Sequence, residues 1–494
     1  MDYIGQMNQH SAIVQGAVIA AWNIGCFVSA MATIFLGDIL GRKKILMIGI
    51  VTMAIGKIIQ CSSYGIGQYI AGRVIAGIGN GFNASTVPTW QAETTKAHRR
   101  GTMLMVSSGA AITLGLTLAY WIDFGLAWAQ PNTVSWRFPI AAQVIWVVPA
   151  IILLPFLPES PRWLILKGRE QEALEVIAAL NDQEPQAEDV RQEFLQIKDA
   201  IIQMAAGGMG SAFSQGEYRN LHRTLLAVLL QVMQQFTGIN LFIQYLAEVF
   251  YTQAVLNQGG GWLARLLAGC CTLVLFLASF VAVIGIDRFW GRRSLTMFGS
   301  SGMCLSMIIL AIMKAINTRA TNDAFTAFVF IYSAFFAIGW QGMSWLWAVE
   351  LTPLSSRGPA NAMATAANWL ANFIVVLVTP VMFVNIGYGT YIVWACFNFA
   401  IVPIIYLFYP ETGCRSLEEV DVLFHHASQT KMPWMTVVKV ANNEPLWYGK
   451  DGETPFLYEQ SEWHQRFARL SADSEPNSSE TGYSGEKPVS DGSY

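Results

Sequence analysis

The stretch "GDILGRKK" at residues 37–44 separates two long apolar runs, and a related stretch, "DRFWGRR", stands at residues 287–293. In both, a Gly precedes a pair of basic residues. The two copies lie 250 residues apart, measured from Arg42 to Arg292. A motif repeated over such a distance predicts a chain built from two similar halves.

Two further features occur twice at similar offsets. They are a Glu seven residues before an Arg, at Glu93 with Arg100 and Glu350 with Arg357, and the motifs "PESPR" at 158–162 and "PETGCR" at 410–415. The acidic residues of the last two motifs are Glu159 and Glu411. We interpret each set of charges as an ion-pair cluster that breaks when one end of the protein opens. The alternative is that they are solvated loop charges, and the duplication favours the cluster.

The composition indicates a membrane protein that crosses the bilayer many times. Of 494 residues, 53% are hydrophobic and only 13% are charged, against about 25% in an average soluble protein. A crossing helix needs about 20 mostly apolar residues. Eleven runs meet this requirement, at 11–35, 45–63, 67–90, 102–122, 137–157, 222–250, 262–286, 294–316, 325–349, 358–384 and 389–409.

The basic residues predict the orientation. Loops that hold clusters of Lys and Arg alternate with loops that hold none, and basic loops face the cytoplasm. This places the segment 158–221 and the C-terminus in the cytoplasm. The domains that we expect are an N-terminal bundle (1–157), a linker with short amphipathic helices (158–221), a C-terminal bundle (222–409) and a tail (410–494) that is disordered from about Ser471.

Amide side chains stand inside an apolar run, in "QQFTGINLFIQY" at residues 234–245. Buried amides need hydrogen-bonding partners, and they suit a solute rich in hydroxyl groups because they both donate and accept. Gly238 allows a local break that would let Gln234, Gln235 and Asn240 reach one cavity. The alternative is that these amides bond neighbouring helices to one another.

Together these motifs resemble the sugar porter family of the major facilitator superfamily. Further motifs of the resemblance are "RVIAGIGNG" at 73–81, "NWLANF" at 368–373 and "PETGCRSLEE" at 410–419, and it extends from about residue 11 to 423. Details such as "YWIDFG" at 120–125 look like fungal members, close to hexose carriers and glycerol–proton symporters. The resemblance implies an all-α membrane protein with two pseudo-symmetric bundles. By this resemblance we expect twelve transmembrane helices, of which eleven would be present here and the first would be missing.

The resemblance also implies site residues. The positions that would contact a sugar or polyol are Gln234, Gln235, Asn240, Tyr245, Trp345, Asn368, Trp369 and Asn372. Those of the ion-pair clusters are Arg42, Glu93, Arg100, Glu159, Arg292, Glu350, Arg357 and Glu411. Arg73 would couple transport to protons, although its usual partner lies on the missing helix; the alternative is that Arg73 extends to the membrane surface. Gly109 and Ala337 depart from the family pattern, so hexose specificity does not follow.

The predicted function is therefore transport of a sugar or polyol by alternating access, in the plasma membrane. Whether it is coupled to protons is left open. No enzyme motif, cofactor motif or metal-ligand spacing is present in the sequence. The partners that we expect are a small sugar or polyol, the lipid bilayer and, for a symporter, a proton. We expect no nucleic acid partner. The other readings are a sugar sensor that does not transport, and an inactive product of a truncated gene model.

Overall fold

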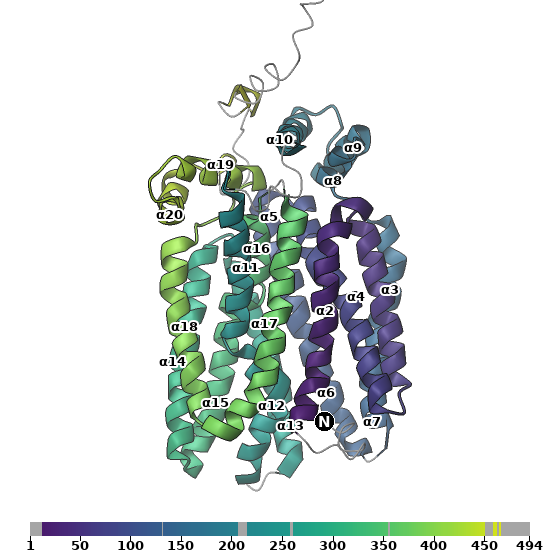
Figure 1. Cartoon of the computed structure of the whole chain (residues 1–494), viewed down its shortest axis with the longest axis vertical. Coiled ribbons are helices and arrows are strands. Elements are labelled where there is room, and N and C mark those ends of the chain that lie inside the picture. The colour runs from purple at the N-terminus through teal and green to yellow at the C-terminus, as the bar shows by residue number, and fades with distance from the viewer. Residues whose placement is uncertain are drawn as a thin grey trace, which may run out of the picture.

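The computed structural model describes residues 12–130, 132–205, 215–256, 260–353, 356–449, 458–461 and 464–465. Within these ranges the chain is helical and contains no strand. Figure 1 shows long helices running side by side, with short helices gathered at one end. The stretch from Ser471, which the sequence predicts to be disordered, lies outside the described residues.

The first half is a bundle of long helices. Its members are α2 (Ala12–Leu40), α3 (Arg42–Cys61), α4 (Ile66–Thr94), α5 (Ala97–Leu104), α6 (Ile112–Leu126) and α7 (Val134–Leu153). The π-helical turn η1 (Met105–Ala111) joins α5 to α6, so these three elements form a single long span.

The second half repeats this arrangement. Its members are α11 (Asn220–Phe236), α12 (Ile239–Leu256), α13 (Gly260–Gly285), α14 (Arg292–Ile316), α15 (Arg319–Phe336), η5 (Ala337–Gln341), α16 (Met343–Leu351), α17 (Arg357–Ile386) and α18 (Gly389–Phe408). The π-helical turn η5 joins α15 to α16, as η1 joins α5 to α6 in the first half.

Ten helices of the described chain are long and apolar enough to cross a membrane. The sequence predicts eleven crossings, and α4 is the one outside this set. It is 29 residues long and packs against both α2 and α3. The glycines and polar side chains of α4 lower its hydropathy. The glycines also allow the backbone of α4 to approach the backbones of α2 and α3 closely.

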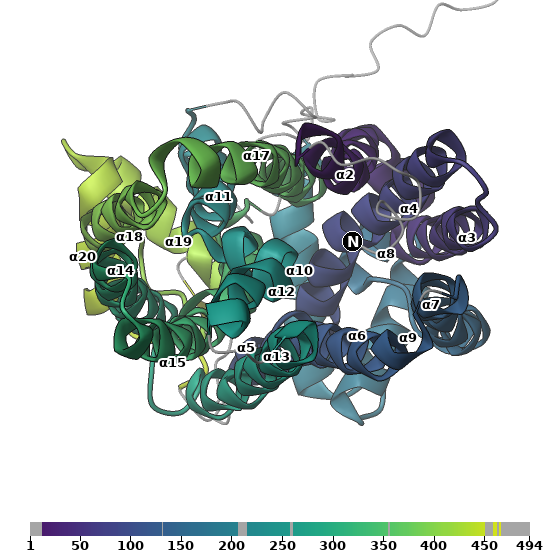
Figure 2. The same cartoon turned by 90° about the horizontal axis from the view of Figure 1, so that it is seen from below.

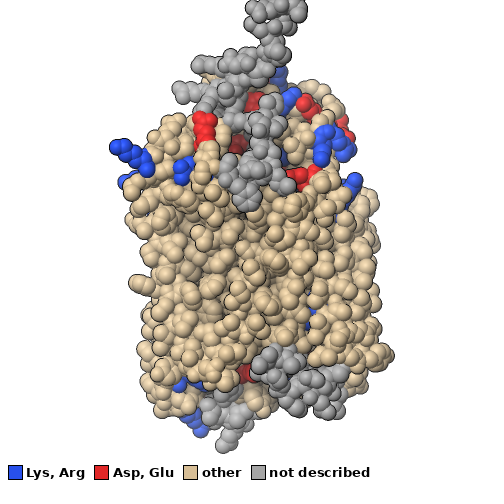
Figure 3. All heavy atoms as spheres, viewed as in Figure 1, with Lys and Arg blue, Asp and Glu red and all other residues tan. Residues whose placement is uncertain are grey.

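Short helices and charged residues mark one end of the molecule. The short helices are α8 (Pro161–Leu166), α9 (Glu170–Asn181), α10 (Glu188–Ala205), α19 (Leu417–Ser428) and α20 (Pro433–Asn443). We call this end the linker end. On the face drawn in Figure 3, most charged residues gather there, a few lie at the opposite end, and the wide belt between is almost free of them. An uncharged belt between two charged ends is the pattern of a protein that crosses a bilayer.

The two halves lie side by side, as the view along the helices shows (Figure 2). They meet along two seams, where α2 packs against α17 and α6 packs against α13. These seams relate the halves by an approximate twofold arrangement, because α2 precedes the first "GRKK" loop and α13 precedes the "GRR" loop.

Glycines bring the backbones of α2 and α4 into contact. A Cβ atom added at Gly77 would lie 2.3 Å from the carbonyl oxygen of Trp22, and one added at Gly25 would lie 2.2 Å from the carbonyl oxygen of Val74. Small residues at such crossings are how membrane helices pack without a hydrophobic driving force between them.

We therefore expect Gly77→Ala to destabilise the protein. Its methyl group would push α2 away from α4, and overpacking of this kind costs about 1–3 kcal/mol. The matched control is Gly125→Ala in α6, where no heavy atom lies within 4 Å of the added Cβ. Thermal unfolding of the purified protein should show a midpoint several degrees lower for Gly77→Ala alone. Equal midpoints for the two variants would contradict this packing.

Candidate functional site

A break in the second half positions the amide side chains. Gly238 has a φ of +90° and separates α11 from α12, as the sequence predicts. The break removes the Thr237 carbonyl oxygen from the helical ladder. The Tyr332 hydroxyl and the Asn398 amide donate to this oxygen at 2.9 and 2.8 Å. These bonds satisfy the backbone at the point where the helix is interrupted, which is what allows the break to persist within a membrane span.

Five amides around the break form one connected network. Asn368 Nδ2 donates to Gln234 Oε1 at 2.8 Å, and Asn372 Nδ2 donates to Gln235 Oε1 at 3.1 Å. Asn240 Nδ2 also donates to Gln235 Oε1, and Gln235 Nε2 lies 3.4 Å from Gln234 Oε1. Each of the five residues is at most 7% exposed. The structure thus brings together all the amides that the sequence selected.

Two further amides belong to this network. Gln231 Oε1 accepts from Asn368 Nδ2 at 2.7 Å, and Asn23 Nδ2 of α2 donates to Asn372 Oδ1 at 2.7 Å. Gln231 lies three and four residues before the Gln pair, a spacing that places it on the same helix face and could have indicated it. No such spacing signals Asn23. Because Asn23 belongs to the first half, the network crosses the interface between the halves.

The three aromatic candidates, Tyr245, Trp345 and Trp369, differ in their contacts. Tyr245 donates its hydroxyl to the Val376 carbonyl oxygen at 3.0 Å, so it bonds to α17 rather than to the amides. Trp345 lies in α16 and is 9% exposed. Trp369 follows Asn368 in α17, and its indole N–H is buried without a hydrogen bond to any described residue. The Trp369 indole N–H could therefore donate a hydrogen bond to a solute.

The two π-helical turns face each other across the interface. Gly109 of the first half lies against Gly342 of the second, with 3.8 Å between an added Cβ at Gly109 and the Gly342 Cα. Gln341 Nε2 reaches the Ser108 carbonyl oxygen at 3.5 Å. The turn η5 ends directly before Gly342. π-Helical turns often occur at functional sites because they widen the helix and shift its register.

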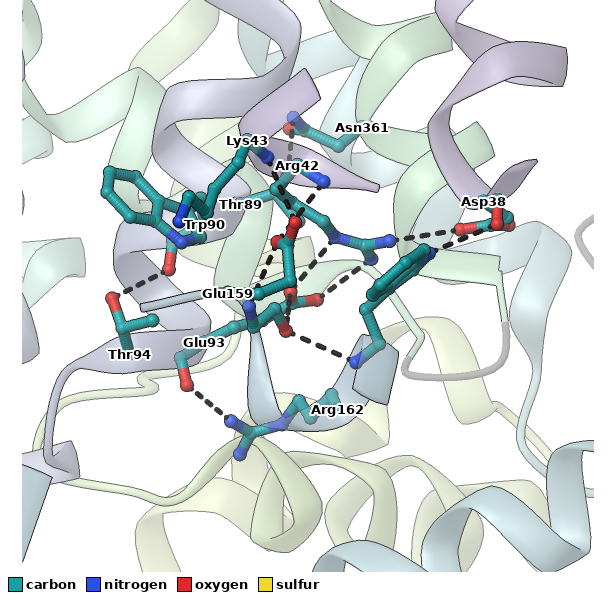
Figure 4. Close-up of polar contacts among 12 residues, drawn as sticks. Asp38, Arg42, Lys43, Thr89, Trp90, Glu93, Thr94, Glu159, Arg162 and Asn361 are labelled. Atoms are coloured by element: carbon teal, nitrogen blue, oxygen red, sulfur yellow. Dashed lines mark hydrogen bonds and ion pairs between the residues drawn. The ribbon is translucent and has the colours of Figure 1, made fainter. Parts of the chain in front are cut away.

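The first ion-pair cluster lies at the linker end of the first half (Figure 4). Arg42 contacts Glu93 through two nitrogens, at 3.2 and 3.3 Å. Glu159 does not meet the Arg42 guanidinium in a hydrogen bond; it accepts instead from the backbone N–H groups of Arg42 and Lys43, both at 3.2 Å, at the start of α3. An acidic side chain at a helix N-terminus satisfies donors that have no partner within the helix.

The second cluster repeats these contacts in the other half. Arg292 contacts Glu350 through two nitrogens, at 3.1 and 2.9 Å. Glu411 accepts from the backbone N–H groups of Arg292 and Arg293 at 3.0 and 3.1 Å. The sequence did not select Asp287, which contacts Arg292 at 2.9 Å, although it stands in the quoted "DRFWGRR" motif.

Arg100 and Arg357 are arranged differently from the other members of the clusters. Arg100 donates to the carbonyl oxygens of Ala92 and Arg415, each at 3.2 Å. Arg357 is 2% exposed, and none of its guanidinium nitrogens makes a hydrogen bond to a described residue. Thus neither bonds to the Glu seven residues before it. Both are buried charges held beside the clusters, so their spacing in sequence does not reflect a direct pair.

Several bonds at the linker end join the two halves. Arg162 Nη2 of α8 contacts Glu418 Oε1 of α19 at 2.7 Å, and the Thr102 backbone N–H donates to Asp287 Oδ2 at 2.7 Å. Burial would raise the pKa of the Glu418 carboxyl, but Arg162 outweighs it and holds that pKa below its ordinary value. The linker end is therefore held together by an ion pair and by a hydrogen bond to a carboxylate in this structure.

Arg73 lies in α4, away from both clusters. Its guanidinium carbon lies 5.9 Å from the centre of the Tyr69 ring, and its Nε is buried without a hydrogen bond to a described residue. Lys57 is a second cation within a span of the first half, with its Nζ 4.5 Å from the centre of the Trp22 ring. Arg73 makes no ion pair with a carboxylate among the described residues.

The arrangement can bind a neutral solute rich in hydroxyl groups. Its amides offer donors and acceptors without charge, and they lie between the two halves. No group of three or more His, Cys, Asp or Glu side chains that could hold a metal ion is present in the described residues.

Comparison with known proteins gives one consistent result. The family model "Sugar (and other) transporter" matches residues 3–424. The chain is 35% identical over 450 residues to "Sugar transporter STL1" of Saccharomyces cerevisiae, covering 89% of this chain and 77% of that protein. It is 36% identical over 413 residues to "MFS-type transporter oryC" of Aspergillus oryzae, covering 82% and 76%.

A solved structure shows the same fold. The proton:xylose symporter XylE, of the major facilitator superfamily, bound to 6-bromo-6-deoxy-D-glucose, superposes with a TM-score of 0.73 at 25% identity, covering 83% of this chain and 88% of that one. With two repeated bundles, an uncharged belt and this match over most of its length, the chain belongs to the sugar transporter family of the major facilitator superfamily.

Proposed function

We propose that this protein carries a small neutral solute, a sugar or polyol, across the plasma membrane by alternating access. The observation that carries this proposal is the network of buried amides at the interface between the halves. A solute bound there contacts both halves at once. The relatives support it, since their names describe a sugar transporter and a proton:xylose symporter.

The proposed orientation places the linker end and the C-terminus in the cytoplasm. The support is the concentration of basic residues in the loops at that end, among them Arg42, Lys43 and Arg293. With this orientation, the bonds between Arg162 and Glu418 and between Thr102 and Asp287 close the cytoplasmic side. The domain boundaries that we propose remain 1–157, 158–221, 222–409 and 410–494.

The direct test is uptake of labelled sugars and polyols by the purified protein in liposomes. We expect saturable exchange for at least one neutral polyhydroxylated solute. A protein that binds such a solute and moves none would be a sensor, and a protein that binds none would contradict the proposal.

Asn240→Ala and Trp345→Ala should weaken solute binding. Loss of the Asn240 amide would leave a solute hydroxyl unpaired, at a cost of about 1–3 kcal/mol, or roughly tenfold to a hundredfold in affinity. Loss of the Trp345 ring would remove an apolar surface for the C–H face of the solute, and Trp345→Phe should restore part of it. Binding to the purified variants is the measurement.

The matched control is Gln60→Ala. Gln60 is also a buried amide, but its Nε2 donates to the Gly72 carbonyl oxygen at 3.0 Å within the first half. We expect this variant to lose stability and keep its affinity. If folded Asn240→Ala and Trp345→Ala bind the solute as the wild type does, the proposed site is wrong.

Glu93→Gln should loosen the linker end. It would remove the buried carboxylate partner of Arg42 and leave only the more exposed Asp38, at 3.3 Å. Breaking a buried pair costs about 3–5 kcal/mol. Spin labels at the exposed positions Lys44 and Ser294, one in each half, should report a broader and longer distance distribution. Glu172→Gln removes an exposed partner of Arg169 instead, where about 0–1 kcal/mol is expected, and should leave the distances unchanged. Equal distances in all three proteins would refute a closing role for the cluster.

We further propose that Arg73 takes part in proton coupling. A cation within a membrane span is costly, and such residues generally mark an ion pathway. Replacement by Leu should abolish accumulation driven by a proton gradient but preserve exchange at equal pH on both sides. Tyr69→Phe, which keeps the ring beside Arg73, serves as the control. Unchanged accumulation in Arg73→Leu would rule out this role.

A further inference from the structure

A polar cavity lies at the linker end, outside the amide network. It has a volume of about 550 Å³, within the range of roughly 300–1,000 Å³ for small-molecule sites. One wall consists of the segment Thr95–His98 with Arg100, a second of residues in α9 and α10, and a third of Ser416, Glu418 and Tyr448. The first wall belongs to the first half, and the third follows the last span of the second half.

The carboxylates of this cavity already have partners. Glu193 accepts from Asn181 at 2.8 Å, and Asp189 accepts from Gln183 at 3.3 Å. Glu418 is paired with Arg162. The negative charge of these three carboxylates is therefore partly neutralised or satisfied by hydrogen bonds within the wall. Asn181 and Gln183 donate through their amide nitrogens, so their amide oxygens can accept hydrogen bonds from a ligand.

The cations of the first wall, Lys96 and Arg100, make no ion pair with a carboxylate among the described residues. Arg100 is 3% exposed and lines the cavity; its Nε and Nη1 donate to carbonyl oxygens, whereas its Nη2 makes no hydrogen bond to a described residue. Lys96 makes no ion pair within the described chain. Lys96 also stands at the N-cap of α5, where no side chain caps the helix. Free donors, a positive helix terminus and two cations at one place favour a phosphate group.

We propose that this cavity binds a phosphate monoester on a polyhydroxylated carbon skeleton. The phosphate would lie against Lys96, Arg100 and the start of α5, and the hydroxyl groups would face the amides and carboxylates of α9 and α10. A free sugar or polyol phosphate and a phosphoinositide headgroup share this chemistry.

Binding there would favour the closed linker end. The cavity takes walls from the first half, the linker and the tail that follows the second half, so it exists in this form only while these parts are together. A ligand stabilises the state that it binds more tightly. The effect on transport rests on the proposed function, but the binding does not. A phosphorylated metabolite would thus slow transport from the linker side.

The test is calorimetric titration of the purified full-length protein with glucose 6-phosphate. Glucose and inorganic phosphate serve as comparison ligands, and nanodiscs with and without phosphatidylinositol phosphate test the headgroup. We expect saturable binding of glucose 6-phosphate or of the phosphoinositide, at least tenfold tighter than glucose or phosphate. The compound that binds shows whether the natural ligand is a free sugar or polyol phosphate or a lipid headgroup. Binding of neither would overturn the proposal.

Lys96→Gln should weaken this binding about tenfold, and Lys96→Arg should retain it. The matched control is Arg99→Gln, which removes the same charge from an exposed neighbour that does not line the cavity. We expect less than a twofold change for Arg99→Gln. An equal loss in both would mean that general electrostatic attraction, rather than this cavity, holds the ligand, and would overturn the proposal.

The coupling is tested in liposomes that contain a transported solute. Glucose 6-phosphate on the linker side should lower the exchange rate of the wild type and of Arg99→Gln, but not that of Lys96→Gln. If binding is present and exchange is unaffected, the link between the cavity and the closed state is refuted. If no solute is exchanged at all, the proposed function fails while the titration still decides the site.

Discussion

The paired contacts of Arg42 with Glu93 and of Arg292 with Glu350 are those on which the organisation of each half depends. Each joins the start of one long helix to the end of another. Each carboxylate also accepts from a hydroxyl group at 2.6 Å, from Ser160 just after the first half and from Thr412 just after the second. Two charged groups that are buried and fully hydrogen-bonded tolerate little displacement, because separation would leave both unpaired. The repeated pair therefore fixes the linker end of each half as a unit.

The spans, the two halves and the break at Gly238 could be predicted from the sequence because they depend on local sequence patterns. Apolar length predicted all the spans of the described chain, and α4 is the one that does not meet the criterion of length and hydropathy in the structure. The repeated "GR" loops predicted the two halves. The Gly238 break followed from glycine among amides. The five selected amides lie together in one hydrogen-bonded network, and their contact with a solute stays a prediction. These predictions succeed because a membrane leaves few ways to satisfy buried polar groups, so each polar residue in an apolar run already restricts the structure.

What the sequence did not predict depends on contacts between distant segments. Asn23 is an isolated polar residue among apolar neighbours, and the packing of α2 against α17 brings it to Asn372. Arg100 and Arg357 follow Glu93 and Glu350 at the same spacing, yet the spacing does not make them pairs, since neither bonds to that Glu. A helix fixes which residues share a face but not which face meets another helix.

The strength of the contacts differs within and between the halves, and this difference suits the proposed mechanism. Within each half, the pairs are bidentate and buried. Between the halves at the network, the described residues are linked by one neutral hydrogen bond, from the Asn23 amide to the Asn372 amide, worth about 0.5–1.5 kcal/mol net. A solute hydroxyl can replace that bond at little net cost, because each amide exchanges one partner for another. Before a solute arrives the amides satisfy one another, so the empty site is not strained. The affinity of such a site comes from the surplus of new bonds over those given up, and this keeps binding reversible, as a carrier that must release its solute on the other side requires.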